Sequence, residues 1–302
     1  MRRLSERFPA AAGVVDVVTD AGTDLKSRLD AARALVWLDA EPETARVVLE
    51  AAGSAGVTHA VVVSTALVYG AWANNPVPLT EEASLRPNPE LDRAVAAAEV
   101  ERLAGEWRDE HPGATVAVLR PTTAVAEDAS GWLARGLHAA RRLRPAEDET
   151  PGQYVHLDDL ASAVATAVDQ RLDGVFNVAP DGWIKGQDMR LLTGGPHLRL
   201  PERMARRLAS LRWRLGLADS PPGLLPYAIH PWVIANDRLR AAGWQPTHTN
   251  EEAFVAGYRP GPLATLSPRR RQELALAGAG VGLAGAAAGA FAVIRRRRRG
   301  RR

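Results

Sequence analysis

The sequence predicts an α/β fold in which a doubly wound parallel sheet carries helices on its faces. Short apolar runs rich in β-branched residues alternate along the chain with segments of helical periodicity, and the connections between them are short. The clearest run is Val61-Val62-Val63, which is followed by the hydroxyl residues Ser64 and Thr65. Such a run is typical of a strand buried on both faces, and ligands bind at the carboxyl ends of these strands.

The elements can be assigned in chain order from this alternation. Strands are expected at residues 14–18, 34–38, 58–65, 115–119 and 174–178. Helices are expected at residues 24–32, 43–55, 90–108, 132–143, 160–168 and 201–215. Asp158 or Asp159 is expected to cap the start of the helix at 160–168. The succession of strand and helix units with short connections indicates a parallel sheet.

Composition excludes several classes of function. The chain has 302 residues and no cysteine, so disulfides and thiolate chemistry are excluded. The net charge of +3 comes from the C-terminal end, since leaving out residues 269–302 gives 28 basic and 34 acidic residues, a net charge of −6. A nucleic-acid groove in the folded part is therefore disfavoured. Residues 1–9 are polar and charged, and without a secretory signal the body is expected to be cytoplasmic.

The pattern changes along the chain in a way that predicts three regions. Residues 1–182 are expected to form the major domain, and residues 183–260 a smaller α-rich lobe with a Pro/Gly linker at 221–226. Residues 261–302 form a linker, an apolar segment and an arginine tail. The apolar segment, 274–294, spans about 31 Å as a helix. Residues 274–302 are expected to associate with an anionic membrane, and the alternative is an Ala/Gly/Arg tail without that role.

Five short motifs occur in a fixed order, and together they resemble the NAD-dependent epimerase/dehydratase family, the extended short-chain dehydrogenase/reductases. Each motif is weak alone, but their order and spacing are specific. The resemblance implies a Rossmann-like domain and runs from about residue 14 to residue 255. The motifs are Gly56-Val57 before the strand ending Ser64-Thr65-Ala66-Leu67-Val68-Tyr69-Gly70, Leu119-Arg120-Pro121-Thr122, Tyr154-Val155-His156-Leu157-Asp158-Asp159-Leu160, Val175-Phe176-Asn177-Val178, and residues 239–246 with Gly243-Trp244.

The resemblance implies NAD or NADP as cofactor and a reaction that uses a Ser/Thr, Tyr and Lys set. The Ser/Thr position falls on Thr65. The tyrosine position falls on Leu91 and the lysine position on Val95, and neither side chain can exchange a proton or bind a ribose. The family chemistry is therefore expected to be impaired. Tyr69 could substitute as the acid/base only by analogy, because its family counterpart is not the catalytic tyrosine.

The glycine-rich turn of the family is also not found, so the first strands of the sheet are expected to be missing from this sequence. A Gly-x-Gly-x-x-Gly string at Gly280, Gly282 and Gly285 has no strand before it, and it is not taken as a cofactor motif. The expected open sheet edge leads to the hypothesis that the product is longer, or that another chain covers the edge, for example in a homodimer.

Candidate site residues follow from the strand ends and from the resemblance. Cofactor contacts are expected from Ser64, Thr65, Arg120, Pro121 and Thr122, with strand-end packing as the alternative. Substrate contacts are expected from His156 and Asn177, although a histidine at a helix entry is more often hydrogen-bonded structure. No metal site is expected. The arginines of the helix at 201–215 could meet phosphates of a nucleotide-sugar, and the alternative is a solvated face.

Two classes of function remain. The first is an NAD(P)-dependent epimerase, dehydratase or reductase that acts on a nucleotide-sugar or another small substrate. It is expected to be active only if upstream sequence supplies the glycine-rich turn and another group replaces the missing tyrosine. The second is a non-catalytic binding or scaffold module, which could be held at a membrane. The apolar pair Leu91 and Val95 favours the second class for activity, and the motifs favour the first class for ancestry.

Overall fold

The computed structural model describes residues 25–30, 32–127, 129–141, 150–193, 200–218 and 220–258. In this part of the chain, four strands form a parallel sheet in the order β1-β2-β3-β7. The α/β prediction is thereby confirmed, and the strand expected at residues 14–18 lies outside the described residues. The four strands are β1 (Leu35–Trp37), β2 (His59–Val63), β3 (Thr115–Pro121) and β7 (Gly174–Val178).

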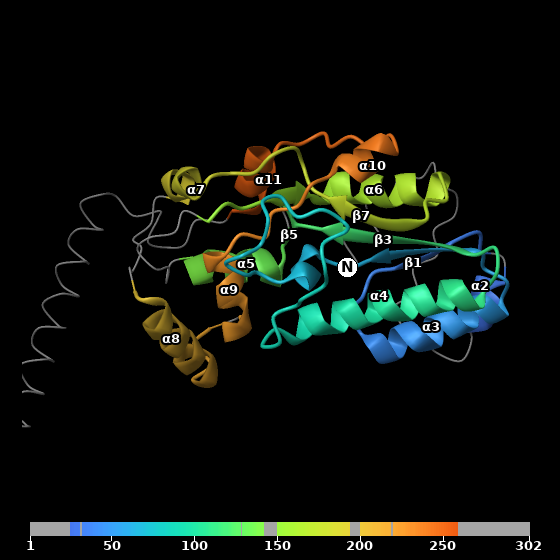
Figure 1. Ribbon diagram of the computed structural model, residues 1–302, viewed down its shortest axis with the longest axis horizontal. Coiled ribbons are helices and arrows are strands. Elements are labelled where there is room, and N and C mark those ends of the chain that lie inside the picture. Colours follow the sequence, from blue (N-terminus) through green and yellow to red (C-terminus); the bar gives the residue numbers. More distant parts are fainter. Residues whose placement is uncertain are drawn as a thin grey trace, which may run out of the picture. The chain divides into compact units, whose positions relative to one another are not determined.

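Helices cover both faces of this sheet. Alternate residues of a strand point to opposite faces, and both sets are apolar here, so each face needs a covering layer. On one face Val62 and Val118 pack with α2 (Leu25–Leu29), α3 (Pro42–Ser54) and α4 (Asp92–Glu110). On the other face Val61 and Leu119 pack with α6 (Leu157–Asp169) and with Leu239 of α10 (Asp237–Ala241). Figure 1 shows these two helical layers on either side of the strands. The continuous apolar run of β2 is thus buried on both faces.

A second, three-stranded sheet follows β3 directly and joins the C-terminal part of the chain to the main sheet. Its order is β5-β4-β6, with β4 antiparallel to β5 and parallel to β6. The strands are β4 (Thr123–Ala126), β5 (Ala129–Ser130) and β6 (Tyr154–His156). Tyr154 and Phe254 share an apolar cluster, so α11 (Asn250–Gly257) packs beside this sheet. Because only Thr122 separates β3 from β4, the end of β3 lies at the junction of the two sheets.

The remaining elements are short and mainly helical. The helical turn η2 follows β2, and α5 lies between β5 and β6 in the chain. The described residues after 183 are mainly helical, as expected, and the division into a major domain and a smaller lobe at 183–260 stays a prediction. These elements are η2 (Ala66–Tyr69), α5 (Trp132–Arg141), α7 (Gly186–Thr193), α8 (Glu202–Arg214), η3 (Pro222–Leu224) and α9 (Leu225–Ile229).

Two local predictions were wrong. The expected linker at 221–226 is η3 followed by the start of α9, and all five residues of α9 are buried, because its apolar side chains pack into the protein. The cap of α6 is His156, neither Asp158 nor Asp159, because the helix begins at Leu157 and the His156 ring accepts the Asp158 N–H. Asp158 and Asp159 instead lie in the first turn, where negative charge favours the helix dipole.

The C-terminal segment was expected to contact a membrane. Residues 274–302 lie outside the described residues, and every described residue belongs to a compact unit that ends at Tyr258. Within the described part of the chain, no helix is both long and apolar enough to cross a bilayer.

Candidate functional site

The chain leaves β2 through a tight turn that sets the position of Ser64 and Thr65. The Ser64 N–H still donates to the Leu119 carbonyl, at 2.8 Å, so Ser64 extends the sheet by one residue. The Thr65 hydroxyl then accepts the Leu67 N–H, at 3.3 Å, and caps η2. The turn ends at Gly70, whose φ of 71° and close approach to the Arg86 carbonyl leave no room for a side chain. The glycine of the motif is therefore required by the backbone.

A buried ion pair lies beside the end of β2. Arg120 of β3 and Glu101 of α4 form a salt bridge of 2.6 Å, with both side chains almost fully buried. The Arg120 Nε also donates to both carboxylate oxygens of Glu101, at 3.1 Å each. The Ser64 hydroxyl donates to the same carboxylate. The Ser64 hydroxyl is therefore bonded within the protein, as expected for a hydroxyl that stabilises the fold.

Tyr69 connects this ion pair to the last strand of the sheet. Its hydroxyl accepts from Arg120 Nη1 and donates to the Asn177 side-chain oxygen, at 2.8 Å in both cases. The Arg120 guanidinium also lies 4.8 Å from the centre of the Tyr69 ring. Tyr69 is 1% exposed, and burial raises its pKa although Arg120 opposes the shift. A buried phenol with both hydrogen-bonding directions in use is poorly suited to exchange protons with a substrate.

The predicted residues Ser64, Arg120 and Asn177 are thus brought together in one buried network with Tyr69 and Glu101. The Asn177 N–H also donates to Glu81, at 2.9 Å, which ties β7 to the loop after Gly70. Carboxyl ends of neighbouring parallel strands meet at one sheet edge, and this rule accounts for the meeting of the three predicted residues.

Leu91 and Val95, at the tyrosine and lysine positions implied by the resemblance, lie in different environments. Leu91 precedes α4 and is 1% exposed, in an apolar cluster with Leu67, Leu224 and Tyr227. Val95 lies one turn later on α4 and is 43% exposed. Leu91 is therefore a core residue, and Val95 is a surface residue.

The segment from η3 to α9 covers Leu91. A side chain at Gly223 would come within 2.0 Å of the Glu90 carbonyl oxygen, so only glycine allows this close approach of the two backbones. The Tyr227 hydroxyl donates to the Leu67 carbonyl, at 2.8 Å, and thereby fastens α9 to the turn after β2. The chain itself thus fills the space next to Leu91.

Pro121 and Thr122 lie where β3 passes into the second sheet. Pro121 pairs with Val178, and the Thr122 hydroxyl donates to the Gln153 carbonyl at 3.0 Å. The Gln153 side chain in turn forms two hydrogen bonds with the backbone of Ile234. Its amide nitrogen donates to the Ile234 carbonyl, and its oxygen accepts the Ile234 N–H. These contacts join the two sheets, and they support the strand-terminus alternative for both residues.

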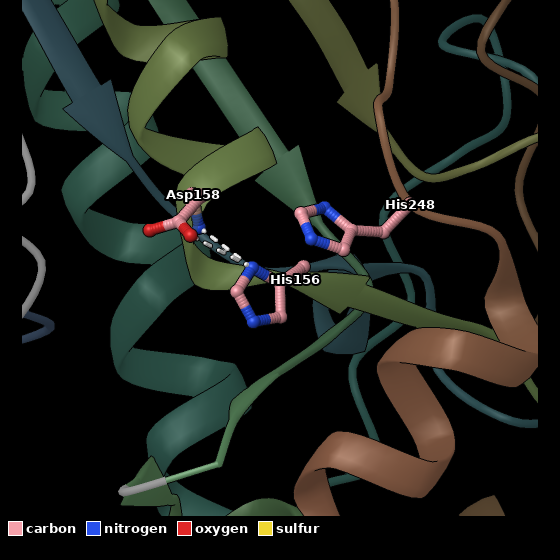
Figure 2. A group of neighbouring side chains, drawn as sticks. All are labelled: His156, Asp158 and His248. Atoms are coloured by element: carbon pink, nitrogen blue, oxygen red, sulfur yellow. Dashed lines mark hydrogen bonds and ion pairs between the residues drawn. The ribbon is translucent and has the colours of Figure 1, made fainter.

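His156 lies away from this network, at the end of β6. Its ring is near Asp158 of α6 and is stacked on His248 of the loop before α11, with ring centres 4.0 Å apart (Figure 2). The side chain of Asp159 is buried and accepts from the Thr247 and His248 backbone N–H groups, at 2.8 and 3.0 Å. The sequence did not point to His248, because this residue lies far along the chain from Asp158.

A hollow of about 390 Å³ also opens between α4, β3 and β7. Its wall includes Arg120, Glu101, Val118 and Val175. Arg120 is the one predicted site residue in this wall, and the position of the hollow had no sequence signal, because it depends on how α4 crosses the sheet.

Known proteins resemble the chain in sequence pattern and in fold. The model of the NAD dependent epimerase/dehydratase family matches residues 6–179, more than half of the sequence. The chain therefore belongs to the NAD dependent epimerase/dehydratase family, as predicted. No curated protein sequence is significantly similar to it.

Solved structures with the same fold share few identical residues with the chain. RMD from Pseudomonas aeruginosa, complexed with NADPH, is similar with a TM-score of 0.59 and 18% identity over 84% of this chain and 93% of that chain. MoeE5 in complex with UDP-glucuronic acid and NAD is similar with a TM-score of 0.57 and 16% identity, over 80% of this chain and 83% of that chain. UDP-glucose 4-epimerase from Thermus thermophilus, complexed with NAD, is similar with a TM-score of 0.53 and 18% identity, over 77% of this chain and 80% of that chain. NAD or NADPH is thus bound in these similar structures, in line with the prediction made from the resemblance.

Proposed function

We propose that this chain is a family member that no longer performs the acid/base chemistry of its relatives and acts as a binding or scaffold module. The observation that carries this proposal is the burial of Leu91 in an apolar cluster beneath η3 and α9. A general acid/base must reach the reacting hydroxyl through a proton-carrying group within about 3.2 Å. Leu91 has no such group, and Val95 next to it has none either.

The described residues fit a bound nicotinamide cofactor poorly. In the family the lysine binds the ribose and lowers the tyrosine pKa, and both tasks need a charged donor. Val95 offers neither charge nor hydrogen bond. Arg120 is a buried cation beside the strand end, but Glu101 and Tyr69 already engage its guanidinium. No step of hydride transfer is therefore assigned to this chain.

The alternative is an enzyme of the same family that acts on a nucleotide-sugar or another small substrate through other residues. Thr65 favours this alternative, because it is partly exposed at the end of β2 and has the hydroxyl that the family uses. The bound molecules named for similar structures are UDP-glucuronic acid and UDP-glucose. They are the first substrates to test.

Titration of the full chain separates the two functions. Nicotinamide fluorescence and thermal shift are followed with NAD(H) and NADP(H), with and without UDP-glucose or UDP-glucuronic acid, and turnover is measured by chromatography. The proposal expects no turnover under any condition, whether or not a ligand binds. Turnover that disappears in a Thr65→Ala variant, while a Ser130→Ala variant keeps it, would replace the proposal with the enzyme alternative.

A membrane surface is proposed as the place of action, and α8 supports this part of the proposal. Met204, Leu208, Leu211 and Leu215 recur at the spacing of one helix face. Met204, Leu211 and Leu215 are each more than half exposed. Only Ala205 of α8 is fully buried, against Leu225 and Ile229 of α9 in an apolar cluster. An apolar stripe that the protein leaves exposed is suited to an apolar partner.

The charges beside this stripe favour an anionic lipid surface as that partner. Arg206 forms ion pairs with Glu202 and Glu90. The other four arginines of α8 have no ion pair among the described residues, and they are Arg203, Arg207, Arg212 and Arg214. Basic residues next to a bilayer containing anionic lipids contribute about 1 kcal/mol each. A basic helix with an exposed apolar stripe is typical of helices that lie in the membrane interface.

Vesicle flotation tests the membrane part. The full chain is mixed with phosphatidylcholine vesicles with and without phosphatidylserine, at low and high salt. We expect salt-sensitive binding to the anionic vesicles, reduced at least fivefold in a Leu211→Glu, Leu215→Glu variant. Leu191→Glu on α7 is the control, since Leu191 is a leucine that is 80% exposed outside α8. Equal binding of all variants would remove α8 from the proposal.

A homodimer is proposed from the sheet edge. Within the described residues β1 pairs with β2 alone, so its other edge has no strand partner there. Light scattering after size exclusion gives the mass of the full chain, and a monomer at micromolar concentration would contradict the dimer.

A further inference from the structure

Three side chains with metal-binding atoms meet at the end of β6. His156 ends that strand, Asp158 lies in the first turn of α6, and His248 comes from the loop before α11. One ligand atom from each of the three lies within 4.8 Å of the others, and Figure 2 shows the two imidazoles and the carboxylate grouped around one space. Two imidazoles and a carboxylate form a donor set that divalent transition metals prefer.

The spacing of His156 and Asp158 already suits a shared ion. The His156 Nδ1 lies 3.3 Å from Asp158 Oδ2. Two ligands with metal bonds of about 2.0–2.1 Å in a tetrahedral site are about 3.3 Å apart, which is the edge of that tetrahedron. The Nδ1 also accepts the Asp158 N–H, but at 3.3 Å this hydrogen bond is long and a metal bond would replace it.

His248 is held by a buried carboxylate in the way that metal-binding histidines often are. Its Nδ1 lies 3.0 Å from Asp159 Oδ2, whose side chain is 1% exposed. If that nitrogen carries the proton, Nε2 keeps its lone pair for a metal. Pairing of the second imidazole nitrogen with a carboxylate fixes the tautomer and raises the basicity of the ligating nitrogen. Asp159 thus serves as the positioning residue for His248.

The site is also accessible and can adjust to an ion. The His248 side chain is 33% exposed and the Asp158 side chain is 50% exposed. The two imidazoles are stacked with an angle of 27° between their planes, so ligation by both requires the His248 ring to rotate. Because Asp159 holds Nδ1, this rotation is a tilt of the ring about the Nδ1–Asp159 contact. The exposure further allows water to complete the coordination of the ion.

We propose that His156, Asp158 and His248 form a binding site for a divalent transition metal, with Zn²⁺ as the best-suited ion. Ca²⁺ and Mg²⁺ prefer oxygen ligands, and two imidazoles disfavour both. The ion joins the start of α6 to the loop before α11, two segments that lie far apart in the sequence. The site is separate from the buried network at the end of β2, so its occupancy does not depend on the proposed loss of catalysis.

Metal titration of the full chain, free of any affinity tag, tests this site. Calorimetry with Zn²⁺ is expected to give one ion per chain, and Co²⁺ is expected to give the intense visible bands of a four-coordinate site. His248→Ala and Asp158→Asn are each expected to weaken Zn²⁺ binding by at least about tenfold, because each removes one of three ligands. Zn²⁺ is also expected to raise the Tm of the wild type and not that of the His248→Ala variant.

His230→Ala is the matched control, because His230 is a partly buried histidine at the end of α9, outside the cluster. This variant is expected to bind Zn²⁺ as tightly as the wild type, and circular dichroism shows whether each variant is folded. The proposal is overturned by a wild-type chain that binds no Zn²⁺. Equal Zn²⁺ affinity in the wild type and the folded His248→Ala and Asp158→Asn variants would overturn it as well.

Discussion

Two ends of strands in this protein have opposite chemical characters. At the end of β2 and β3, charged and polar side chains are buried and bonded to one another, as in the Glu101–Arg120 pair. At the end of β6, His248 and Asp158 keep a third to a half of their side-chain surface exposed. The first end holds the fold together, and the second end offers donor atoms to a ligand. The family resemblance pointed to residues at both ends, Ser64, Thr65 and Arg120 at the first and His156 at the second, and the metal site proposed above lies at the second.

The largest expected effect comes from breaking the buried pair. Glu101→Ala is expected to lower the free energy of unfolding by about 3–5 kcal/mol, because it leaves Arg120 buried without its carboxylate. Urea denaturation measures the loss. Glu99→Ala is the control in the same helix, since Glu99 pairs with Arg102 at the surface and its loss should cost less than about 1 kcal/mol. Similar losses in both variants would mean that the end of β2 is not structural.

Leu91 and Val95 give the next largest difference. Leu91→Ala is expected to cost about 2–5 kcal/mol, because it leaves a cavity under α9. Val95→Ala is expected to stay within about 0.5 kcal/mol, because that side chain is largely solvated. Chemical denaturation of the two variants gives the comparison. A cost below about 1 kcal/mol for Leu91→Ala would reopen the space beside Thr65 as a candidate site.

Alkaline pH tests the core behind the β6 end. Burial raises the pKa of Tyr154, so the folded chain keeps a proton that the unfolded chain loses near its ordinary pKa of about 10. This stability is complete below about pH 10 and is lost as the pH rises toward the folded pKa, by about 1.4 kcal/mol per pH unit. Tyr154→Phe should make the fall of the unfolding free energy with pH shallower by about 1.4 kcal/mol per pH unit. Tyr258→Phe, at a partly exposed ring, is the control, and unfolding free energies from about pH 9 to about pH 11.5 give both slopes.

The smallest effect is expected at the exposed end itself. Without metal, His248→Ala should cost less than about 1 kcal/mol, because the Asp159 carboxylate keeps its bonds to the Thr247 and His248 backbone. Thermal unfolding in the presence of a chelator measures this cost. A loss above about 3 kcal/mol would show that His248 is as structural as Glu101, and the contrast between the two ends would disappear.

Local patterns were sufficient to predict most of the fold. The apolar run 61–63 and its neighbours predicted the parallel strands, because burial on both faces demands such runs. The helix at 157–169 was predicted with a start three residues late. The error arose because Asp is a frequent N-cap, whereas here the imidazole of His156 performs that task.

The candidate sites were predictable only where chain neighbours determine them. Ser64, Arg120 and Asn177 follow adjacent strands or lie in them, so topology alone brings them together. Glu101 could have been suspected from a carboxylate on the inner face of α4, but its partner depends on how that helix crosses the sheet. His248 gave no signal, since its meeting with His156 depends on the path of the whole C-terminal lobe.

Gly223 has a consequence for the history of the protein. Its hydrogen side chain lets η3 press against the Glu90 carbonyl, directly over Leu91. A single mutation that restored tyrosine at position 91 would have to fit a larger, polar ring into that closed space. The reversion would therefore be unfavourable until η3 and α9 had first moved away. If the family chemistry has been lost as proposed, a glycine in a distant part of the chain therefore opposes its return.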